Sequence, residues 1–269
     1  MRCRRYRPAL LVVVAALAVP AAAESSAATL PTRAQGTLTV AVDIGTIGLA
    51  EGSVSGGVIK HASGFEIDLA RALAQRLGLG LELVDVPFAQ TFTAGTKPFD
   101  VALSHVTITG ERTRSVDFSA PYFVVNKGVL VAPGVTPPAS LADLRQLRIC
   151  AQSSTTSLGY VLTKLRPTRA PQSFPSPIDA LRALSDGFCQ AMVADLEILV
   201  AAKRAQPDLY GAIAGQIVTD EHYGAVFQKR SKLRAPVGKA LGALARSGVV
   251  IRLAARWFGA GWDRRPVLS

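Results

Sequence analysis

The stretch Phe99–Tyr122, FDVALSHVTITGERTRSVDFSAPY, changes character once along its length. It opens with Val101–Leu103, an apolar run that suits a short strand buried on both faces. Hydroxyl and imidazole side chains follow at once, and Arg112 comes a few residues later. Hydroxyls give directed hydrogen bonds, and a guanidinium group matches a carboxylate with two parallel bonds. Because ligands of open α/β sheets lie beyond the carboxyl ends of strands, the stretch predicts an anion site there.

The composition is that of a globular protein. The chain has 269 residues, enough for one large domain or two small ones. Its formal charge of +11 falls to +7 when four arginines at the N-terminus (Arg2, Arg4, Arg5 and Arg7) are left out. The remaining charge is spread along the chain and aromatic residues are few, whereas nucleic-acid sites need concentrated basic patches with stacking platforms. We therefore expect no nucleic-acid partner.

Residues 1–23 have the pattern of a secretory signal peptide. Basic residues precede the apolar run Ala9–Val19, and an A-x-A cleavage site, Ala21–Ala23, follows it. The run is too short to span a bilayer. Cys3 precedes the apolar run, so the mature chain has no lipobox cysteine there. We expect cleavage, a linker over 24–35, and a periplasmic or secreted mature protein.

Two cysteines, Cys150 and Cys189, remain in the mature chain. An oxidising compartment permits a disulfide between them. Two buried free thiols are the other interpretation, because the sequence does not give their separation. Both alternatives stay open at this point.

The opening stretch is similar to a known family. The run FD-x4-H-VTIT-x-ER-x4-DFS-x-PY resembles the bacterial extracellular solute-binding proteins, family 3, of polar amino acid ABC transporters. The helix opening Gly64–Ala70 and the closing Arg256–Gly259 resemble further hallmarks of the family, so the resemblance runs from about Leu38 to Gly259. His105 departs from the pattern, because relatives usually carry a small residue there.

The resemblance implies an α/β fold of the type II periplasmic-binding-protein class, with two lobes and a ligand cleft between them. The first lobe would comprise 36–123 and 223–269, and the second lobe 127–220. The lobes would close over a small carboxylate-bearing solute, by default an amino acid, and present it to the membrane permease of an ABC importer. We expect a monomer without a cofactor.

The resemblance also implies how the first lobe holds the carboxylate of the solute. Arg112 would clamp it, helped by Thr107 and Ser104. His105 stands where relatives contact the ligand, so it is a further candidate. Its role as a binding or a catalytic residue is left open.

Two more first-lobe residues are candidates with ordinary alternatives. Phe88 follows a predicted strand at 81–86 and would cover the apolar part of the solute, although most phenylalanines are simply core. Asp43 follows the first predicted strand and would lie near the amino group of the solute, but a turn or cap explains it equally well. The Gly-rich segment 45–57 after it is predicted to be a loop.

In the second lobe, a polar turn, Gln152–Ser157, leads into a predicted helix. Such a turn presents free backbone N–H groups to an anion. The equivalent family segment meets the ligand carboxylate, which implies contacts from Gln152, Thr155 and Thr156. Ser154 stands where relatives usually have glycine. An ordinary helix cap is the alternative.

Asp195 ends an apolar run that is predicted to be a buried strand. A carboxylate there is costly to bury without a cation. It matches the family residue that pairs with the α-ammonium of the ligand. Helix capping is the alternative for this residue.

The sequence has little support for catalysis. There are three histidines, and no HExxH, paired CxxC, GxSxG or phosphate-loop motif, so we expect no metal and no catalytic residue. One alternative stays open, because cyclohexadienyl (prephenate or arogenate) dehydratases share this fold. His105 could then act as a general acid near neutral pH, with Glu197 and Glu221 as further acids.

Overall fold

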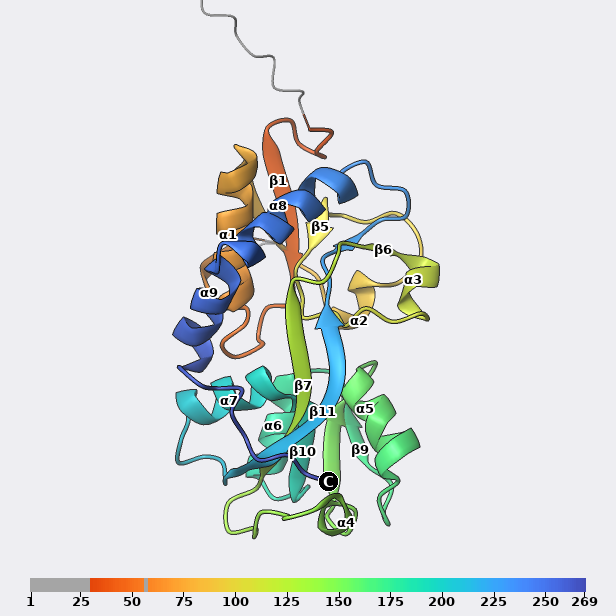
Figure 1. The fold of residues 1–269 in the computed structure, drawn as a ribbon, viewed down its shortest axis with the longest axis vertical. Coiled ribbons are helices and arrows are strands. Elements are labelled where there is room, and N and C mark those ends of the chain that lie inside the picture. Colours follow the sequence, from red (N-terminus) through yellow and green to blue (C-terminus); the bar gives the residue numbers. More distant parts are fainter. Residues whose placement is uncertain (1–29, 56–57) are drawn as a thin grey trace, which may run out of the picture.

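The computed structural model describes residues 30–55 and 58–269. The predicted signal peptide 1–23 and the first part of the linker 24–35 lie outside these residues. The described chain forms two lobes along its long axis, joined by two long strands (Figure 1). Each lobe contains a five-stranded sheet with helices around it. The predicted two-lobed α/β fold is therefore confirmed.

The first lobe is built on a sheet with the strand order β4-β1-β5-β12-β6. Its strands are β1 (Thr37–Val42), β4 (Gly80–Asp85), β5 (Val101–Ala102), β6 (Asp117–Phe118) and β12 (Val226–Phe227). Strand β1 runs parallel to both of its neighbours, β4 and β5. The carboxyl ends of these three strands therefore share one edge of the sheet, and polar residues that follow them are brought together.

The helices of the first lobe differ in length on its two sides (Figure 1). The longer ones, α1 (Phe65–Leu77), α8 (Arg234–Arg246) and α9 (Val249–Phe258), pack together on one side. On the other side lie two single turns, α2 (Phe88–Thr91) and α3 (Arg112–Ser115). The segment 45–57 is not wholly a loop as predicted: β2 (Glu51–Ser55) pairs with β3 (Val58–Ser63) in a hairpin.

The second lobe has the strand order β11-β7-β10-β8-β9. Its strands are β7 (Phe123–Val131), β8 (Ile149–Gln152), β9 (Gln172–Phe174), β10 (Ala191–Asp195) and β11 (Ile213–Tyr223). Its helices are α4 (Leu141–Leu144), α5 (Thr156–Tyr160) with the π-helical continuation η1 (Val161–Leu165), α6 (Pro177–Ser185) and α7 (Leu196–Ala205). Helix α5 therefore begins a few residues after the end of β8, within the predicted polar turn.

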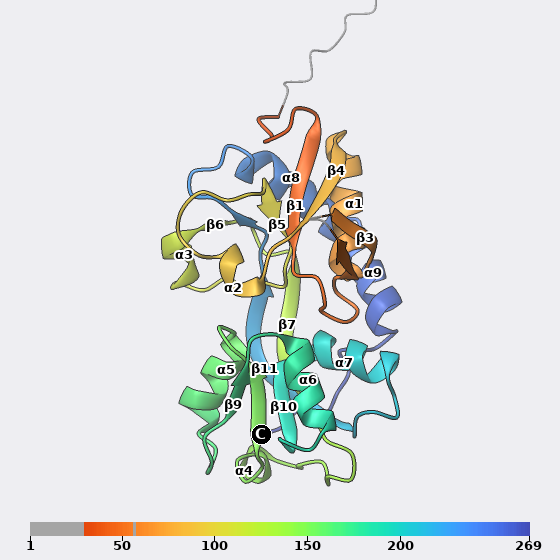
Figure 2. The same cartoon turned by 180° about the vertical axis from the view of Figure 1, so that it is seen from behind.

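Strands β7 and β11 connect the lobes and form the hinge (Figures 1 and 2). They are antiparallel, with Phe123 opposite Tyr223 at the first-lobe end. The ring of Phe123 packs 5.2 Å from that of Phe65 in the first lobe, whereas Val129 belongs to the core of the second. Each hinge strand is thus anchored in both cores, and any lobe movement bends these two strands.

The C-terminal segment returns to the second lobe after α9 (Figures 1 and 2). Val267 forms a bridge with Gln216 of β11, and Leu268 is buried in the second-lobe core. The backbone N–H of Leu141 donates to the carbonyl oxygen of Ser269 at 3.2 Å. The prediction that all of 223–269 lies in the first lobe is wrong for these last residues, because an apolar side chain near the end fills the other core.

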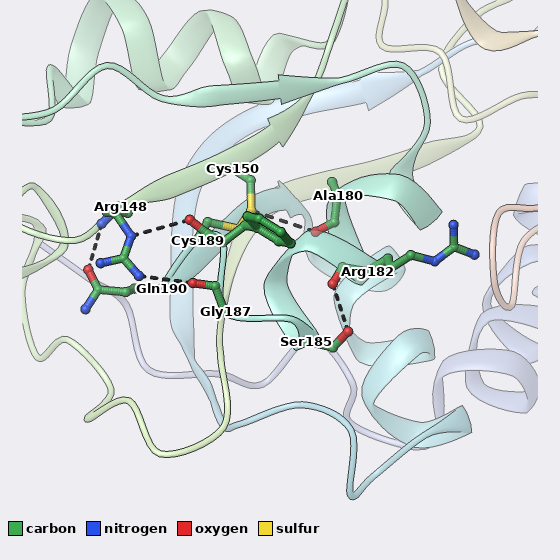
Figure 3. The surroundings of a disulfide bond; sticks show 9 residues. Arg148, Cys150, Ala180, Arg182, Ser185, Gly187, Cys189 and Gln190 are labelled. Atoms are coloured by element: carbon green, nitrogen blue, oxygen red, sulfur yellow. Dashed lines mark hydrogen bonds between the residues drawn. A yellow bond between two sulfur atoms is a disulfide. The ribbon is translucent and has the colours of Figure 1, made fainter.

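Cys150 and Cys189 form a disulfide, which selects one of the two alternatives that the sequence left open (Figure 3). Cys150 lies on β8, and Cys189 lies just before the adjacent strand β10. The two Cα atoms are 5.9 Å apart, within the usual range for a disulfide. The bond closes a loop through α6 inside the second lobe, away from the hinge.

Candidate ligand-binding cleft

A narrow cavity lies between the lobes where the strand ends of both sheets meet. Its volume is about 10 Å³, room for about one water molecule. Its lining residues come from both lobes: Phe88, His105, Thr107, Arg112, Gln152, Thr155, Thr156, Ser157, Val193, Ala194, Asp195 and Ile198. All the predicted site residues except Asp43 and Ser104 line it. The lobes are therefore closed around their own side chains.

Arg112 connects the two lobes. It opens the short helix α3, and its guanidinium group donates to the carbonyl oxygen of Thr107 in its own lobe at 2.8 Å. It also donates to the carbonyl oxygen of Ser154 in the other lobe at 2.8 Å. The group lies over the rings of Phe92 and Phe88, 4.3 and 5.4 Å from their centroids. Two of its five N–H groups are thus used, and the aromatic rings fix its plane.

The two departures from the family pattern share a backbone conformation. His105 has φ 44° and Ser154 has φ 62°, both in the left-handed region that glycine occupies without steric cost. This explains why small residues are usual at these two positions. In this chain His105 and Ser154 each place a larger side chain there, and both residues lie at the cleft.

Lys127 is a site residue that the sequence interpretation missed. It lies on hinge strand β7 and is fully buried. Its ammonium group donates to Asp195 at 2.6 Å, to Glu221 at 2.8 Å and to the hydroxyl of Thr156 at 2.6 Å. A charged residue inside the mainly apolar run 123–131 was the available signal, because such a residue is almost never buried without partners.

Asp195 lies at the end of β10 and is almost completely buried. Besides Lys127, it accepts hydrogen bonds from the hydroxyl of Ser157 at 3.1 Å and from that of Tyr223 at 2.6 Å. Burial alone would raise its pKa, but Lys127 and the hydrogen bond from Tyr223 hold the pKa below its ordinary value. Asp195 is therefore ionised and already paired with a cation of the protein itself.

Glu197 lies behind this pair and does not line the cavity. Its side chain is fully buried and shares a short hydrogen bond with the hydroxyl oxygen of Tyr223. Because the single O–H of Tyr223 is donated to Asp195, a protonated Glu197 is the donor in this bond. Burial, reinforced by the neighbouring charge of Asp195, raises the pKa of Glu197 to about 8. The folded protein therefore holds this carboxyl group largely protonated at neutral pH.

His105 is held by a second buried acid, Glu66, from the start of α1. The backbone N–H of His105 donates a short hydrogen bond to Glu66, and Nδ1 lies 3.5 Å from its other oxygen. The imidazole ring stacks on Phe88 with centroids 5.0 Å apart. Burial would lower the pKa of His105, but Glu66 outweighs it and raises the pKa. His105 thus forms the floor of the cavity with Phe88.

The two remaining predicted residues lie just outside the cavity lining. Ser104 is buried, and its hydroxyl donates to the carbonyl oxygen of Ala41 at 3.5 Å. Asp43 follows β1 and is half-buried. Burial raises its pKa to about 6, against the opposing charge of His105. Neither residue makes a direct side-chain contact with Arg112 in this closed arrangement.

Open space adjoins the closed cavity on the outer side of Arg112. This mouth has a volume of about 520 Å³ and shares Arg112, Thr155 and Thr156 with the cavity. The rest of its lining is mainly small and polar: Phe92, Thr109, Glu111, Ser115, Ser154, Gly159 and Thr163. Another hollow of about 310 Å³ lies behind the hinge and shares no lining residue with the cleft. The predicted site residues that line these hollows therefore do so at the cleft and its mouth, and none of them lines the hollow behind the hinge.

The described residues contain neither a metal-binding cluster nor a membrane-spanning helix. No group of three or more His, Cys, Asp or Glu side chains in 30–55 and 58–269 is placed to hold a metal ion. No helix in that part of the chain is long and apolar enough to cross a bilayer.

Two lobes joined by two strands, with polar strand ends facing across a cleft, define a hinge-closing solute-binding protein. The family model of bacterial extracellular solute-binding proteins, family 3, matches residues 55–260. The chain belongs to this family, and the family assignment made from the sequence is confirmed.

Similar proteins bind amino acids according to their names. The arginine-binding extracellular protein ArtP of Bacillus subtilis is 29% identical over 204 residues, which cover 72% of this chain and 77% of ArtP. An ancestral arginine-binding protein bound to glutamine has a TM-score of 0.72 and 29% identity, covering 84% of this chain and 99% of that chain. The ancestral amino acid-binding protein AncCDT-1, a precursor of cyclohexadienyl dehydratase, has a TM-score of 0.70 and 27% identity, covering 83% and 95%.

Proposed function

We propose that this chain captures a small carboxylate-bearing solute outside the cytoplasm and delivers it to the membrane permease of an ABC importer. The observation that carries the proposal is the position of Arg112. Its guanidinium group, held by Thr107 in one lobe and by Ser154 in the other, sits where the lobes meet and keeps free donors. A carboxylate that binds these donors is held by both lobes at once.

Hinge closure follows from this geometry. A solute that contacts both lobes favours the closed form by the difference between its affinities for the closed and open forms. Closure removes water from the guanidinium–carboxylate contact, which strengthens that contact in the lower dielectric of the cleft. Thr107 and Gln152 line opposite walls and would position the solute, while Phe88 and His105 form the floor.

The relatives suggest an amino acid as the first solute class to test, because two of those named above bind arginine or glutamine and the third is described as an amino acid-binding protein. The predicted signal peptide fits a mature protein in the periplasm or outside the cell. We propose that it acts as a monomer, because the cleft is completed by the two lobes of one chain.

Thermal unfolding of the mature protein against amino acids and organic acids tests this function. A solute that binds the folded state raises the melting temperature by mass action. Arg112→Ala should abolish the shift, since it removes the carboxylate clamp. Arg114→Ala, an exposed arginine two residues further on α3, is the matched control and should keep the shift. Retained binding in Arg112→Ala would show that the clamp is assigned wrongly.

We further propose that the cleft binds without catalysis. Of the three acids considered for a dehydratase, Glu197 does not line the cavity, and Glu221 is held by Lys127 and Thr156. His105 does line it, but Glu66 holds its backbone and faces its ring. Incubation with prephenate should therefore leave prephenate unchanged. Formation of phenylpyruvate would assign the chain to the enzymes instead.

A further inference from the structure

The pair Lys127–Asp195 is built into the second-lobe sheet by strand register. Lys127 on β7 lies directly opposite Asp195 on the antiparallel neighbour β10. Side chains at such positions are close neighbours on one face of a sheet. Glu221 comes from β11, the neighbour on the other side of β7. All three charged groups belong to one sheet. Parting the lobes does not separate Lys127 from Asp195, because the two residues lie opposite each other in paired strands.

All the donors of Lys127 are engaged, and both oxygens of Asp195 accept hydrogen bonds. An ammonium group has three N–H donors, and Lys127 directs them to Asp195, Glu221 and Thr156. Both oxygens of Asp195 are also occupied, one by Lys127 and Ser157 and the other by Tyr223. A second ammonium group at Asp195 would have to displace Lys127 or lie beside it.

We infer that Lys127 takes the place of a solute ammonium, so that the cleft selects carboxylates without an α-ammonium group, such as 2-hydroxy and 2-oxo acids. The inference rests on the proposed function and narrows it. Lys127 is then a specificity-determining residue. It contributes the positive charge that an amino acid would otherwise bring to Asp195.

Displacement of Lys127 is unfavourable because it would take a buried ammonium group away from its hydrogen-bond partners. Its side chain is fully buried, and its backbone is fixed between β10 and β11. A solute ammonium bound to Asp195 would lie beside the ammonium of Lys127 in a site that excludes water. Like charges at such a separation repel strongly when they are desolvated.

The other acids near the cleft do not offer a replacement partner. Glu197 and Asp43 do not line the cavity. Glu66 faces His105 and accepts a hydrogen bond from Tyr122 at 3.3 Å. Glu111 lines the mouth but is exposed, where an ion pair contributes little. Glu221 is already paired with Lys127, and Asp195 is the one carboxylate among the described residues that line the cavity. An α-ammonium therefore finds no unpaired carboxylate in that lining.

The mouth provides the space for the body of such a solute. Its 520 Å³ adjoin the cavity at Arg112, Thr155 and Thr156. A carboxylate on Arg112 would leave the 2-hydroxyl or 2-oxo oxygen near hydroxyl groups, which can donate to or accept from oxygen. Oxygen substituents thus suit the lining where an ammonium does not.

Matched solutes that differ only at the α-position test the inference by calorimetry and thermal unfolding. The sets are L-alanine, L-lactate and pyruvate; L-glutamate, 2-hydroxyglutarate and 2-oxoglutarate; and L-phenylalanine, phenyllactate and phenylpyruvate. Wild-type protein should bind at least one 2-hydroxy or 2-oxo acid at least about tenfold more tightly than the matching amino acid, about 1.4 kcal/mol. Arg112→Ala should lose this binding, which places it in the cleft.

Lys127→Ala tests the role of the residue itself, because it empties the space and frees Asp195. The variant should gain affinity for amino acids by at least about tenfold. Lys229→Ala, which removes an exposed ion pair with Asp117, is the control and should keep the wild-type preference. If Lys127→Ala does not fold, the wild-type comparison of matched solutes still decides.

The outcomes separate the two proposals. If wild-type protein binds an amino acid as tightly as its 2-hydroxy and 2-oxo analogues, the inference is overturned and the proposed function stands. If a 2-oxo or 2-hydroxy acid binds but is chemically converted, the solute class stands and binding without catalysis is overturned. If no carboxylate binds the wild type or the variant, the proposed function fails and the inference fails with it.

Discussion

The two buried cations of the cleft, Arg112 and Lys127, are held in opposite ways. Arg112 bonds to backbone carbonyl groups of both lobes and carries donors that no protein group uses. Lys127 bonds only to side chains of the second-lobe sheet and its helix, and all of its donors are engaged. A cation with free donors between lobes can recruit an anion, whereas a saturated cation within one lobe blocks a competing cation.

The two cations also differ in whether their contacts change when the lobes open. Opening the lobes must break the contact of Arg112 with Ser154, because these residues lie in different lobes. The same motion leaves the Lys127–Asp195 pair intact, because β7 and β10 are paired strands of one sheet. The contacts of Arg112 therefore change when the lobes close, whereas the positive charge of Lys127 stays beside Asp195 in both arrangements.

Removing Asp195, the carboxylate partner of Lys127, should have the largest effect on stability. Asp195→Ala should lower the free energy of unfolding by about 3–5 kcal/mol, because it leaves a buried ammonium without its main partner. Urea unfolding measures the change. The control is Asp117→Ala, which breaks an exposed pair with Lys229 and should cost less than about 1 kcal/mol. Equal losses in both variants would mean that the buried pair contributes no more to stability than the exposed pair.

The protonated acid behind the pair should make stability fall as pH rises. Glu197 has a pKa of about 8 when folded, above its ordinary value of 4.5. Between these values the unfolded chain binds fewer protons at this group than the folded protein does, so raising the pH favours unfolding by up to about 1.4 kcal/mol per pH unit.

Glu197→Gln isolates this contribution, because the amide does not titrate. The raised pKa values of Asp43 and His105 also make stability fall as pH rises, and they are common to both proteins. Urea unfolding between pH 5 and pH 7 should therefore show a smaller loss in the variant than in the wild type. Parallel curves would mean that Glu197 is ionised in the folded state.

Removing the hydroxyl group of Thr156, which lies between Lys127 and Glu221, should have the smallest effect on stability. Thr156 accepts from Lys127 and donates to Glu221, each at 2.6 Å. Thr156→Val keeps the shape and should cost about 1–2 kcal/mol, because one donor of Lys127 is left without a partner. Thr163→Val removes an exposed hydroxyl at the mouth and should change stability by less than about 0.5 kcal/mol. Melting temperatures of the two variants give the comparison.

The sequence predicted the first half of this comparison but not the second. The position of Arg112 could be predicted because the residue lies in a short motif directly after a buried strand, and polar residues that follow parallel strands converge. Lys127 lies 68 residues before Asp195, and its role depends on the register of two strands. Register is set by tertiary pairing, which the local sequence does not contain.

Other features escaped prediction for the same physical reason. The contact between Glu66 and His105 joins residues 39 positions apart. The hairpin of β2 and β3 forms in a Gly-rich segment whose local composition favours a loop. The C-terminal residues join the second lobe through Leu268, one apolar side chain that carries no periodic signal. Each feature depends on a partner elsewhere in the chain.

The order in which the chain is synthesised gives the C-terminal segment a further consequence. Strand β12 lies between β5 and β6, so the first sheet stays split until residues 226–227 have emerged. The second core receives Leu268 later still. Until residues 226–227 have been synthesised, β5 presents an edge without its native partner, and an unpaired strand edge can pair with another chain.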